Sequence, residues 1–271
     1  MEAIYEEGYE ISLAITLKDE VAVNKSGRVY LDELCKKNNT QLIKVEHINE
    51  DKSFKEILSH DIDRLFVIGW SQLLSSDLIK SVPGGVYGMH PTLLPAGRGR
   101  AAIPWTILKK LEITGVSLFK IEEKVDSGAL LLQDKYKIPL DIDATNLYKL
   151  SKESHVRLMK SSLPLFERDI IKEIIQDEQL ATYWPQRKPE DGQIDLLGSI
   201  RDAEILIRAV TKPYPGAFII NNKLKTIIWK CTILHSKKLI PSGSKYFEFK
   251  DGILVCEEYE EHNTQNNFMK K

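Results

Sequence analysis

The first half of the chain alternates short apolar runs with amphipathic segments, and this alternation restricts its fold more than any other feature. Leu65-Phe66-Val67-Ile68 is a continuous apolar run, which is typical of a strand that is covered on both faces. Such strands with helical patterns between them predict an open α/β sheet, whose ligands bind at the carboxyl ends of the strands. The expected strands are 9–17, 41–46, 64–69, 85–89, 115–121 and 129–138, and the expected helices between them are 28–38, 53–60 and 75–81.

The second half begins with a long helical pattern. It runs from Asp143 to Lys172 and contains Pro164, which would kink the helix or restart it. A segment rich in proline, glycine and charge follows at 181–195, and a short helix is expected at 199–210. We therefore expect two domains, a larger α/β domain at 1–180 and a linker with a small β-rich domain at 181–271.

The C-terminal region predicts hairpins. Asn221-Asn222 and Asp251-Gly252 are turn signals between strand-like segments. Residues 261–270 are polar and are expected to fray.

The N-terminus predicts a helix at 2–7 that ends at Gly8 and is followed directly by a strand. In a doubly wound sheet the first strand is central and precedes the first helix, yet nothing precedes Met1. We therefore expect the first strand to be missing, with a gap between its neighbours. We also expect that Met1 lies downstream of the true start or that the chain is truncated.

Composition bounds the class of protein. Of the 271 residues, 42% are hydrophobic and the net charge is -1, so no overall field favours nucleic acid or an anionic membrane. Residues 181–271 carry 14 Lys+Arg against 11 Asp+Glu, which is only mildly basic. Cys35, Cys231 and Cys256 have neither zinc-site spacing nor a disulfide framework. We expect a soluble, cytoplasmic protein without a metal or a membrane span.

The stretch 88-GMHPTLLPAGRGRAAIPW-105 concentrates constrained backbone around one histidine. A strand would end at Met89, and His90 would follow on a stiff turn at its carboxyl end, because Pro91 restricts the residue before it. Gly97 and Gly99 would let backbone approach a ligand, and Arg98 and Arg100 could neutralise an anion such as a phosphate. A helix at 101–110 would also favour an anion at its N-terminus, while the absence of Walker A and GxGxxG spacing argues against nucleotide hydrolysis and NAD chemistry.

The residues alone leave two interpretations of His90 open, a catalytic base and a structural turn residue. The remaining histidines are interpreted as structural or exposed. They are His47, His60, His155, His235 and His262.

The segment 90-HPTLLPAGRGRAAIPWTILKKLEITGVSLFKIEEKVDSGALLLQ-133 resembles the signature of the folate-dependent formyltransferases: HPSLLP, an RGR-type glycine loop, a helix, TGV in a strand, and VDSG. The segments 183-YWPQRKPEDGQID-195 and 205-ILIRAVTKPYPGAF-218 are similar to the region that joins the two domains of the tRNA and sugar enzymes of that family. The resemblance implies a Rossmann-like formyltransferase domain, a linker helix and a small OB-like barrel.

The resemblance also implies transfer of a formyl group from N10-formyltetrahydrofolate to an amine. His90 would accept the proton of the amine and, once protonated, hydrogen-bond the oxyanion, while Asp126 would orient and charge-stabilise His90. The simpler interpretation of Asp126 is a turn residue before Ser-Gly. The family's usual Asn lies two residues before the histidine, where this chain has Gly88. Losing one oxyanion donor costs on the order of a hundredfold in rate, so a backbone N–H or another side chain replaces it, or the enzyme is slow or altered.

For the folate, the resemblance implies a pterin slot at the end of the strand that precedes the histidine strand. Its expected residues are Ile68, Gly69 and Trp70 on one side and Val125, Ser127 and Gly128 on the other. The alternative for the first three is a buried strand end followed by a turn.

Three acceptors compete. Glycinamide ribonucleotide is disfavoured because its enzyme lacks the extra C-terminal domain, and initiator tRNA because it calls for a strongly positive surface. A nucleotide-linked amino sugar needs only groups for its diphosphate and its base or hexose. The expected contacts are Arg98, Arg100 and Arg187 for the diphosphate and Tyr183 or Trp184 for stacking, with Lys25 and Arg28 as further phosphate candidates. Each of these residues has a plain structural alternative.

The favoured hypothesis is a sugar N-formyltransferase that acts on a dTDP- or GDP-linked 4-amino-4,6-dideoxyhexose in bacterial surface-polysaccharide synthesis. Methionyl-tRNA formyltransferase and a non-catalytic binding protein on the same fold are the alternatives. A hydrogen-bond donor beside His90, or its absence, would distinguish the enzymes from the binding protein. Nucleic acid is not the expected partner, and the oligomeric state stays open, a homodimer included.

Overall fold

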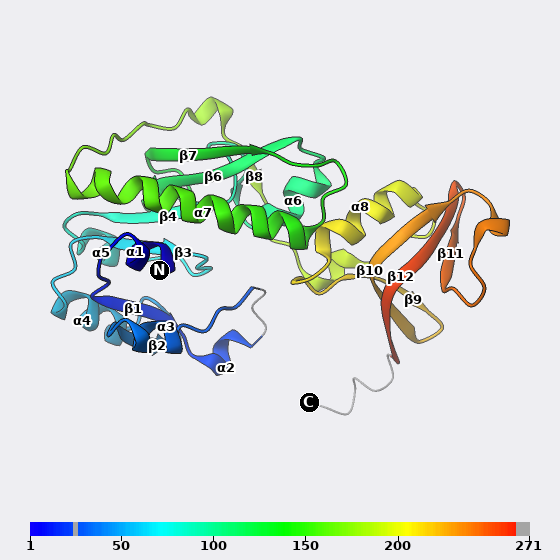
Figure 1. Ribbon diagram of the computed structural model, residues 1–271, viewed down its shortest axis with the longest axis horizontal. Helices are drawn as coiled ribbons and strands as arrows, with labels where there is room; N and C mark the ends of the chain where they lie inside the picture. The colour runs from blue at the N-terminus through cyan, green and yellow to red at the C-terminus, as the bar shows by residue number, and fades with distance from the viewer. Residues whose placement is uncertain (24–26, 264–271) are drawn as a thin grey trace. The chain divides into compact units, whose positions relative to one another are not determined.

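The computed structural model describes residues 1–23 and 27–263 (Figure 1). Lys25 and residues 264–271, which include most of the segment expected to fray, lie outside the described residues. The chain divides into two compact units and passes between them several times, while the domain boundary at residue 180 stays a prediction. The first unit comprises Met1–Gly99, Thr114–Tyr136 and Ser151–Trp184, and the second comprises Arg100–Ile113, Lys137–Leu150 and Pro185–Lys271.

The first unit is built on a four-stranded sheet in the order β3-β4-β6-β7. β3 runs parallel to β4, whereas β6 is antiparallel to β4, with Gly88 opposite Phe119 and His90 opposite Ser117. Directly opposite residues point to the same face of a sheet, so these four side-chain positions share one face. The bounds are Leu65–Ile68 for β3, Val86–His90 for β4, Ile113–Lys120 for β6 and Leu130–Lys137 for β7.

Helices cover both faces of this sheet, as the continuous apolar runs predict. On one face, Tyr87 and Met89 of β4 pack in a cluster with Leu158 and Phe166 of α7. On the other face, Val86 packs with residues of α4 and α5. α7 continues through Pro164 and ends at Glu167, earlier than expected. The bounds are Glu2–Glu6 for α1, Asp51–Ser59 for α4, Ser76–Lys80 for α5 and Ala144–Glu167 for α7.

A separate two-stranded parallel sheet is formed by β1 (Leu13–Leu17) and β2 (Gln41–Val45). In the described part of the chain no strand ladder joins β1 to β3, and Figure 1 shows the two sheets apart. The strands expected in one sheet therefore form two, while the expectation about the start of the chain stays a prediction. Two short helices belong to this region, α2 (Asp19–Ala22) and α3 (Asp32–Lys37), the latter shorter than expected.

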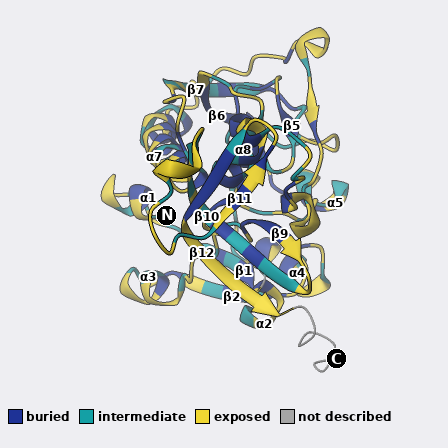
Figure 2. Cartoon of the chain, turned by 90° about the vertical axis from the view of Figure 1, so that its right-hand side faces the viewer, coloured by how far each residue is buried: buried dark blue, intermediate teal, exposed yellow. Residues whose placement is uncertain are grey.

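The second unit contains the predicted small β-rich domain, an antiparallel sheet in the order β11-β12-β10-β9. α8 (Ile200–Val210) presents six buried residues and packs against β10. Figure 2 shows β12 passing from a buried to an exposed stretch. No helix among the residues that the structure describes is long and apolar enough to cross a bilayer. The remaining bounds are Ala102–Leu108 for α6, Ala217–Asn221 for β9, Leu224–Leu234 for β10, Lys237–Leu239 for η3, Tyr246–Phe249 for β11 and Gly252–Asn263 for β12.

Candidate active site

His90 is the last residue of β4, at the carboxyl end of the strand, and only 9% of it is exposed. Its Nε2 lies 2.8 Å from the carbonyl oxygen of Gly97, and its Nδ1 lies 3.6 Å from Oδ2 of Asp126. Because a carbonyl oxygen only accepts hydrogen bonds, we assign the ring hydrogen to Nε2. In the neutral ring this leaves the lone pair on Nδ1, beside the carboxylate of Asp126.

The loop after His90 is anchored by Ser117, a fully buried residue of β6. The hydroxyl of Ser117 donates to the carbonyl oxygen of Thr92 at 2.7 Å and accepts from the backbone N–H of Leu94 at 3.0 Å. At the far end of the loop, the N–H of Gly97 donates to Oγ1 of Thr182 at 2.8 Å. Sequence reasoning missed Ser117 and Thr182, although an inward-facing serine in an apolar strand is a signal of a buried hydrogen bond.

Asp126 reaches the same place from the loop between β6 and β7. Its backbone is in the left-handed region with a φ of 52°, and its Oδ2 accepts the backbone N–H of Gly99 at 2.8 Å. His90 and Asp126, 36 positions apart in the sequence, are thus brought together by the fold. A carboxylate held in this position stabilises a positive charge on the imidazole ring.

Gly97 and Gly99 are needed where two short strands pair, which the sequence did not predict. β5 (Arg98–Gly99) pairs in parallel with β8 (Tyr183–Trp184). Gly97 and Gly99 have φ values of 75° and 107°, and a Cβ on Gly99 would lie 2.5 Å from the backbone oxygen of Trp184. A Cβ on Gly97 would lie 2.9 Å from the Trp184 ring. The close neighbour of these glycines is therefore Trp184, in the place where we expected a ligand.

Arg98 is buried inside the protein, whereas we expected it to contact a phosphate. Its side chain is fully buried, and its guanidinium donates to Gln176, to Glu178 and to the hydroxyl of Tyr183 at 2.7–3.1 Å. The hydrogen bond with Glu178 raises the pKa of Arg98, and the same bond lowers the pKa of Glu178. This guanidinium is bound by other protein groups, so Arg98 is not a phosphate-binding candidate in this structure. Trp184 is likewise buried, whereas Tyr183 is 60% exposed.

The position of the missing Asn is enclosed by apolar side chains. A Cβ on Gly88 would lie 3.0 Å from Cε1 of Phe119 and 3.1 Å from Cδ1 of Ile121. Neither side chain carries a hydrogen-bond donor. The atoms nearest to this position are therefore apolar.

The carboxyl end of β3 is open on the side where a pterin slot was expected. Ile68 is 43% exposed, and no described atom outside the neighbouring residues lies within 4 Å of a Cβ built on Gly69. The indole N–H of Trp70 is buried and has no hydrogen-bond partner within the described structure. Val125 is also exposed, whereas Gly128 is buried with its Cα against the carbonyl oxygen of Lys120. The carboxyl end of β3 is therefore open at Ile68 and Gly69, whereas the indole N–H of Trp70 is enclosed.

Two expected arginines lie in the second unit. Arg100 donates to Oε1 of Gln186 at 2.8 Å, and Arg187 donates to the carbonyl oxygen of Asp191 at 2.7 Å. The guanidinium of Arg187 lies 5.3 Å from the ring centroid of Trp105, and burial lowers its pKa. In the first unit, Arg28 donates to Thr16, Asp19 and the carbonyl oxygen of Leu17.

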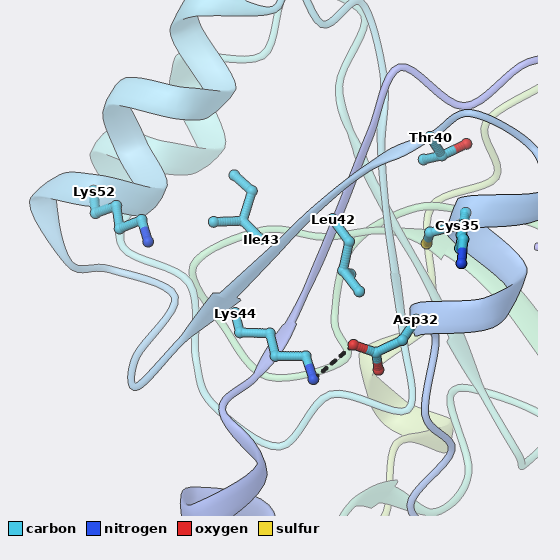
Figure 3. Close-up of a pocket in the computed structure, with 8 residues that line it drawn as sticks. Asp32, Cys35, Thr40, Leu42, Ile43, Lys44 and Lys52 are labelled. Carbon is cyan, nitrogen blue, oxygen red and sulfur yellow. Dashed lines mark ion pairs between the residues drawn. The ribbon is translucent and has the colours of Figure 1, made fainter.

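A shallow hollow of about 530 Å³ lies elsewhere in the first unit, between α3, β2 and α4 (Figure 3). Lys44 faces Asp32 across it, with Nζ and Oδ1 2.8 Å apart. It contains none of the expected site residues, so the candidate site rests on the His90–Asp126 geometry. Among residues 1–23 and 27–263, no cluster of three or more His, Cys, Asp or Glu side chains could hold a metal ion.

His155 of α7 was interpreted as structural, and it is half-buried near His90. Its Nδ1 lies 2.7 Å from the carbonyl oxygen of Ser151. Burial lowers the pKa of His155, and the nearby His90 lowers it further, while hydrogen bonds to the backbones of Ser151 and Met89 raise it. A neutral imidazole is therefore the favoured form of His155.

Comparison with known families agrees with this arrangement. The profile described as "Formyl transferase" matches residues 8–163, and "Formyl transferase, C-terminal domain" matches residues 187–258. The first profile alone spans more than half of the chain. The chain belongs to the formyl transferase family.

Solved structures share the fold at low sequence identity. HypX from Aquifex aeolicus, solved with tetrahydrofolic acid, is 15% identical over 95% of this chain, with a TM-score of 0.68. The match covers 46% of HypX, so the chain spans about half the length of that protein. Methionyl-tRNA formyltransferase from Clostridium thermocellum is 19% identical over 93% of this chain and 97% of its own, with a TM-score of 0.63. The N-formyltransferase from Helicobacter canadensis, solved with folinic acid and dTDP-3-aminofucose, is 17% identical over 93% of this chain and 100% of its own, with a TM-score of 0.61.

Proposed function

We propose that this protein transfers the formyl group of N10-formyltetrahydrofolate to the amino group of a dTDP- or GDP-linked 4-amino-4,6-dideoxyhexose, for the synthesis of bacterial surface polysaccharide. The observation that carries formyl transfer is the pairing of His90 Nδ1 with Asp126 Oδ2 at 3.6 Å, in a chain of the formyl transferase family. A dTDP-linked amino sugar as acceptor is supported by the Helicobacter canadensis neighbour, whose ligand dTDP-3-aminofucose carries its amino group at C3 and not at the proposed C4.

In the proposed reaction, the acceptor nitrogen bonds to the formyl carbon, the bond from that carbon to N10 of the folate breaks, and N10 gains a proton. His90 takes the proton that the acceptor amine loses, on Nδ1, the nitrogen that carries the lone pair. Asp126 then stabilises the imidazolium through its charge. The hydrogen bond from Nε2 to Gly97 fixes the ring orientation and tautomer.

The formyl donor is proposed to bind at the carboxyl end of β3. Ile68 and Val125 offer exposed apolar surface, and Gly69 leaves its backbone open. The indole N–H of Trp70 is buried, and its ring packs against the core, so we propose Trp70 as part of the apolar wall of this slot. Ser127 and Gly128 complete the loop that carries Asp126.

For the acceptor, we propose Tyr183 as the stacking residue, since its ring is exposed while Trp184 is buried. Within the second unit, Arg100 and Arg187 stay proposed phosphate-binding residues, because a guanidinium can bind a phosphate through two parallel hydrogen bonds. The modest excess of basic residues at 181–271, 14 against 11, supports a diphosphate over a tRNA.

One observation favours the alternative of a non-catalytic binding protein. Phe119 and Ile121 enclose the position at Gly88, so no side-chain amide there can stabilise negative charge on the formyl oxygen. An enzyme without this donor is expected to be slower by on the order of a hundredfold.

The test is release of tetrahydrofolate from N10-formyltetrahydrofolate by the purified protein, with dTDP-, GDP- and UDP-linked amino sugars. His90→Asn and Asp126→Asn are expected to lose about a hundredfold or more in turnover. His262→Asn, at a side chain that is 57% exposed, is the matched control and should turn over normally. Turnover with initiator methionyl-tRNA alone would overturn the sugar acceptor, and no turnover with any acceptor would favour the binding protein.

A further inference from the structure

We infer that Gln176 is a positioning residue that holds Asp126 beside His90, an inference that rests on the proposed function. Gln176 lies in the segment between α7 and the 3₁₀ helix η1 (Glu178–Leu180). It is 5% exposed, whereas its neighbour Ile175 is 90% exposed. A single polar side chain is therefore directed inward from an exposed segment, which calls for a reason.

The side-chain amide of Gln176 makes four hydrogen bonds. Its Nε2 donates to the carbonyl oxygens of Asp126 at 2.9 Å and Gly128 at 2.7 Å. Its Oε1 accepts from Nε and Nη2 of Arg98 at 3.1 and 2.8 Å. Because the amide nitrogen faces only acceptors and the amide oxygen faces only donors, its orientation is fixed.

These bonds determine the backbone of the loop that carries the proposed catalytic carboxylate. Asp126 has a φ of 52°, in the left-handed region that a residue with a side chain rarely adopts without support. Gln176 holds the carbonyl of that residue and the carbonyl two positions further on. With its backbone held, Asp126 directs Oδ2 to the N–H of Gly99 and to Nδ1 of His90.

Arg98 closes the arrangement from the other side. Its buried guanidinium binds Gln176 and Glu178, while Gly99, the next residue, donates its N–H to Asp126. The dipeptide Arg98-Gly99 therefore contacts both the support of Asp126 and its carboxylate. The role of Arg98 follows from this geometry: it holds the carbonyl side of the Gln176 amide in place.

Gln176→Glu is the sharpest test because it keeps the size of the side chain. The carboxylate can still accept from Arg98, but it has no N–H for the carbonyl oxygens of Asp126 and Gly128. Gln176→Ala is the second variant and removes both sets of bonds. Glu178→Gln is the matched control, because it weakens the ion pair of Arg98 but keeps both hydrogen bonds from Gln176 Nε2 to the Asp126 loop.

The first readout needs no activity: hydrogen exchange and the chemical shift of the Gly99 amide, whose N–H donates to Asp126 Oδ2. We expect exchange to accelerate by about tenfold or more in Gln176→Glu and Gln176→Ala and to stay unchanged in Glu178→Gln. An unchanged Gly99 amide in folded Gln176 variants would overturn the inference. A shifted amide in a protein without formyl transfer would support the positioning of Asp126 and overturn the proposed function alone.

The second readout separates positioning from general support of the fold. We expect kcat to fall by about 10- to 100-fold in Gln176→Glu with little change in KM. In the Asp126→Asn background the same substitution should cost nothing further, because its effect passes through that carboxylate. Equal losses in both backgrounds would assign Gln176 a purely structural role.

Discussion

Gly88→Asn is expected to destabilise the protein, although it introduces the residue that the family usually has. A Cβ at this position already lies 3.0 Å from Phe119 and 3.1 Å from Ile121, closer than ordinary van der Waals contact. The amide adds three more heavy atoms in the same direction. Overpacking of this kind costs about 1–3 kcal/mol, a large part of the roughly 5–15 kcal/mol that stabilises a native domain.

A double-mutant cycle with Phe119→Ala measures the conflict directly. Alone, Phe119→Ala is expected to cost about 3–5 kcal/mol, since it leaves a cavity in the core. Beside Asn at position 88 it should cost about 1–3 kcal/mol less, because the removed ring is the obstacle. Urea unfolding gives the four free energies of unfolding. Leu131→Ala, a core change in the cluster on the other face of the sheet, is the control and should be additive with Gly88→Asn.

The reasoning is refuted if Gly88→Asn lies within about 0.5 kcal/mol of the native chain and the cycle with Phe119→Ala is additive. The same variants test the chemistry. If the new amide reaches the formyl oxygen once the ring is gone, the double variant should release tetrahydrofolate faster, by up to about a hundredfold.

Three further outcomes are expected. Gly99→Ala should lower the melting temperature more than Gly8→Ala, because both have positive φ but only Gly99 also has a backbone oxygen 2.5 Å from the new Cβ; equal effects would contradict this. Burial lowers the pKa of His155, so its contribution to the free energy of unfolding is present above the unfolded value of about 6.5 and is lost as pH falls through the lower folded pKa. His155→Gln should make the urea midpoint depend less on pH in that window. If the midpoint changes with pH as much as in the native chain, His155 is not the cause of that dependence. Ser117→Ala should cost about 1–3 kcal/mol in urea unfolding by leaving the buried groups of the His90 loop unpaired, whereas Ser162→Ala, which loses one bond within its own helix, should cost less.

The sequence predicted well what depends on local pattern. The run Leu65–Ile68 became a strand, although it is half-buried with Ile68 exposed, and the strand before Pro91 ends at His90, one residue later than expected. Element ends were less predictable, since the strand expected at 9–17 starts at Leu13. The expected gap in the sheet agrees with the described residues, in which no strand ladder joins β1 to β3.

The residues that surround the candidate site were less accessible to sequence reasoning, for a physical reason. The sequence around an arginine does not show whether water or protein accepts its hydrogen bonds. The groups that accept those of Arg98 lie about 80 positions away in the chain. Gln176 gives no local signal either, because a glutamine next to charged residues such as Asp177 and Glu178 is typical of exposed chain. Its role depends on two carbonyl groups whose orientation exists only after Asp126 has adopted a left-handed backbone. The pattern thus located the histidine and the carboxylate, while the groups that hold them together are defined only by the folded chain.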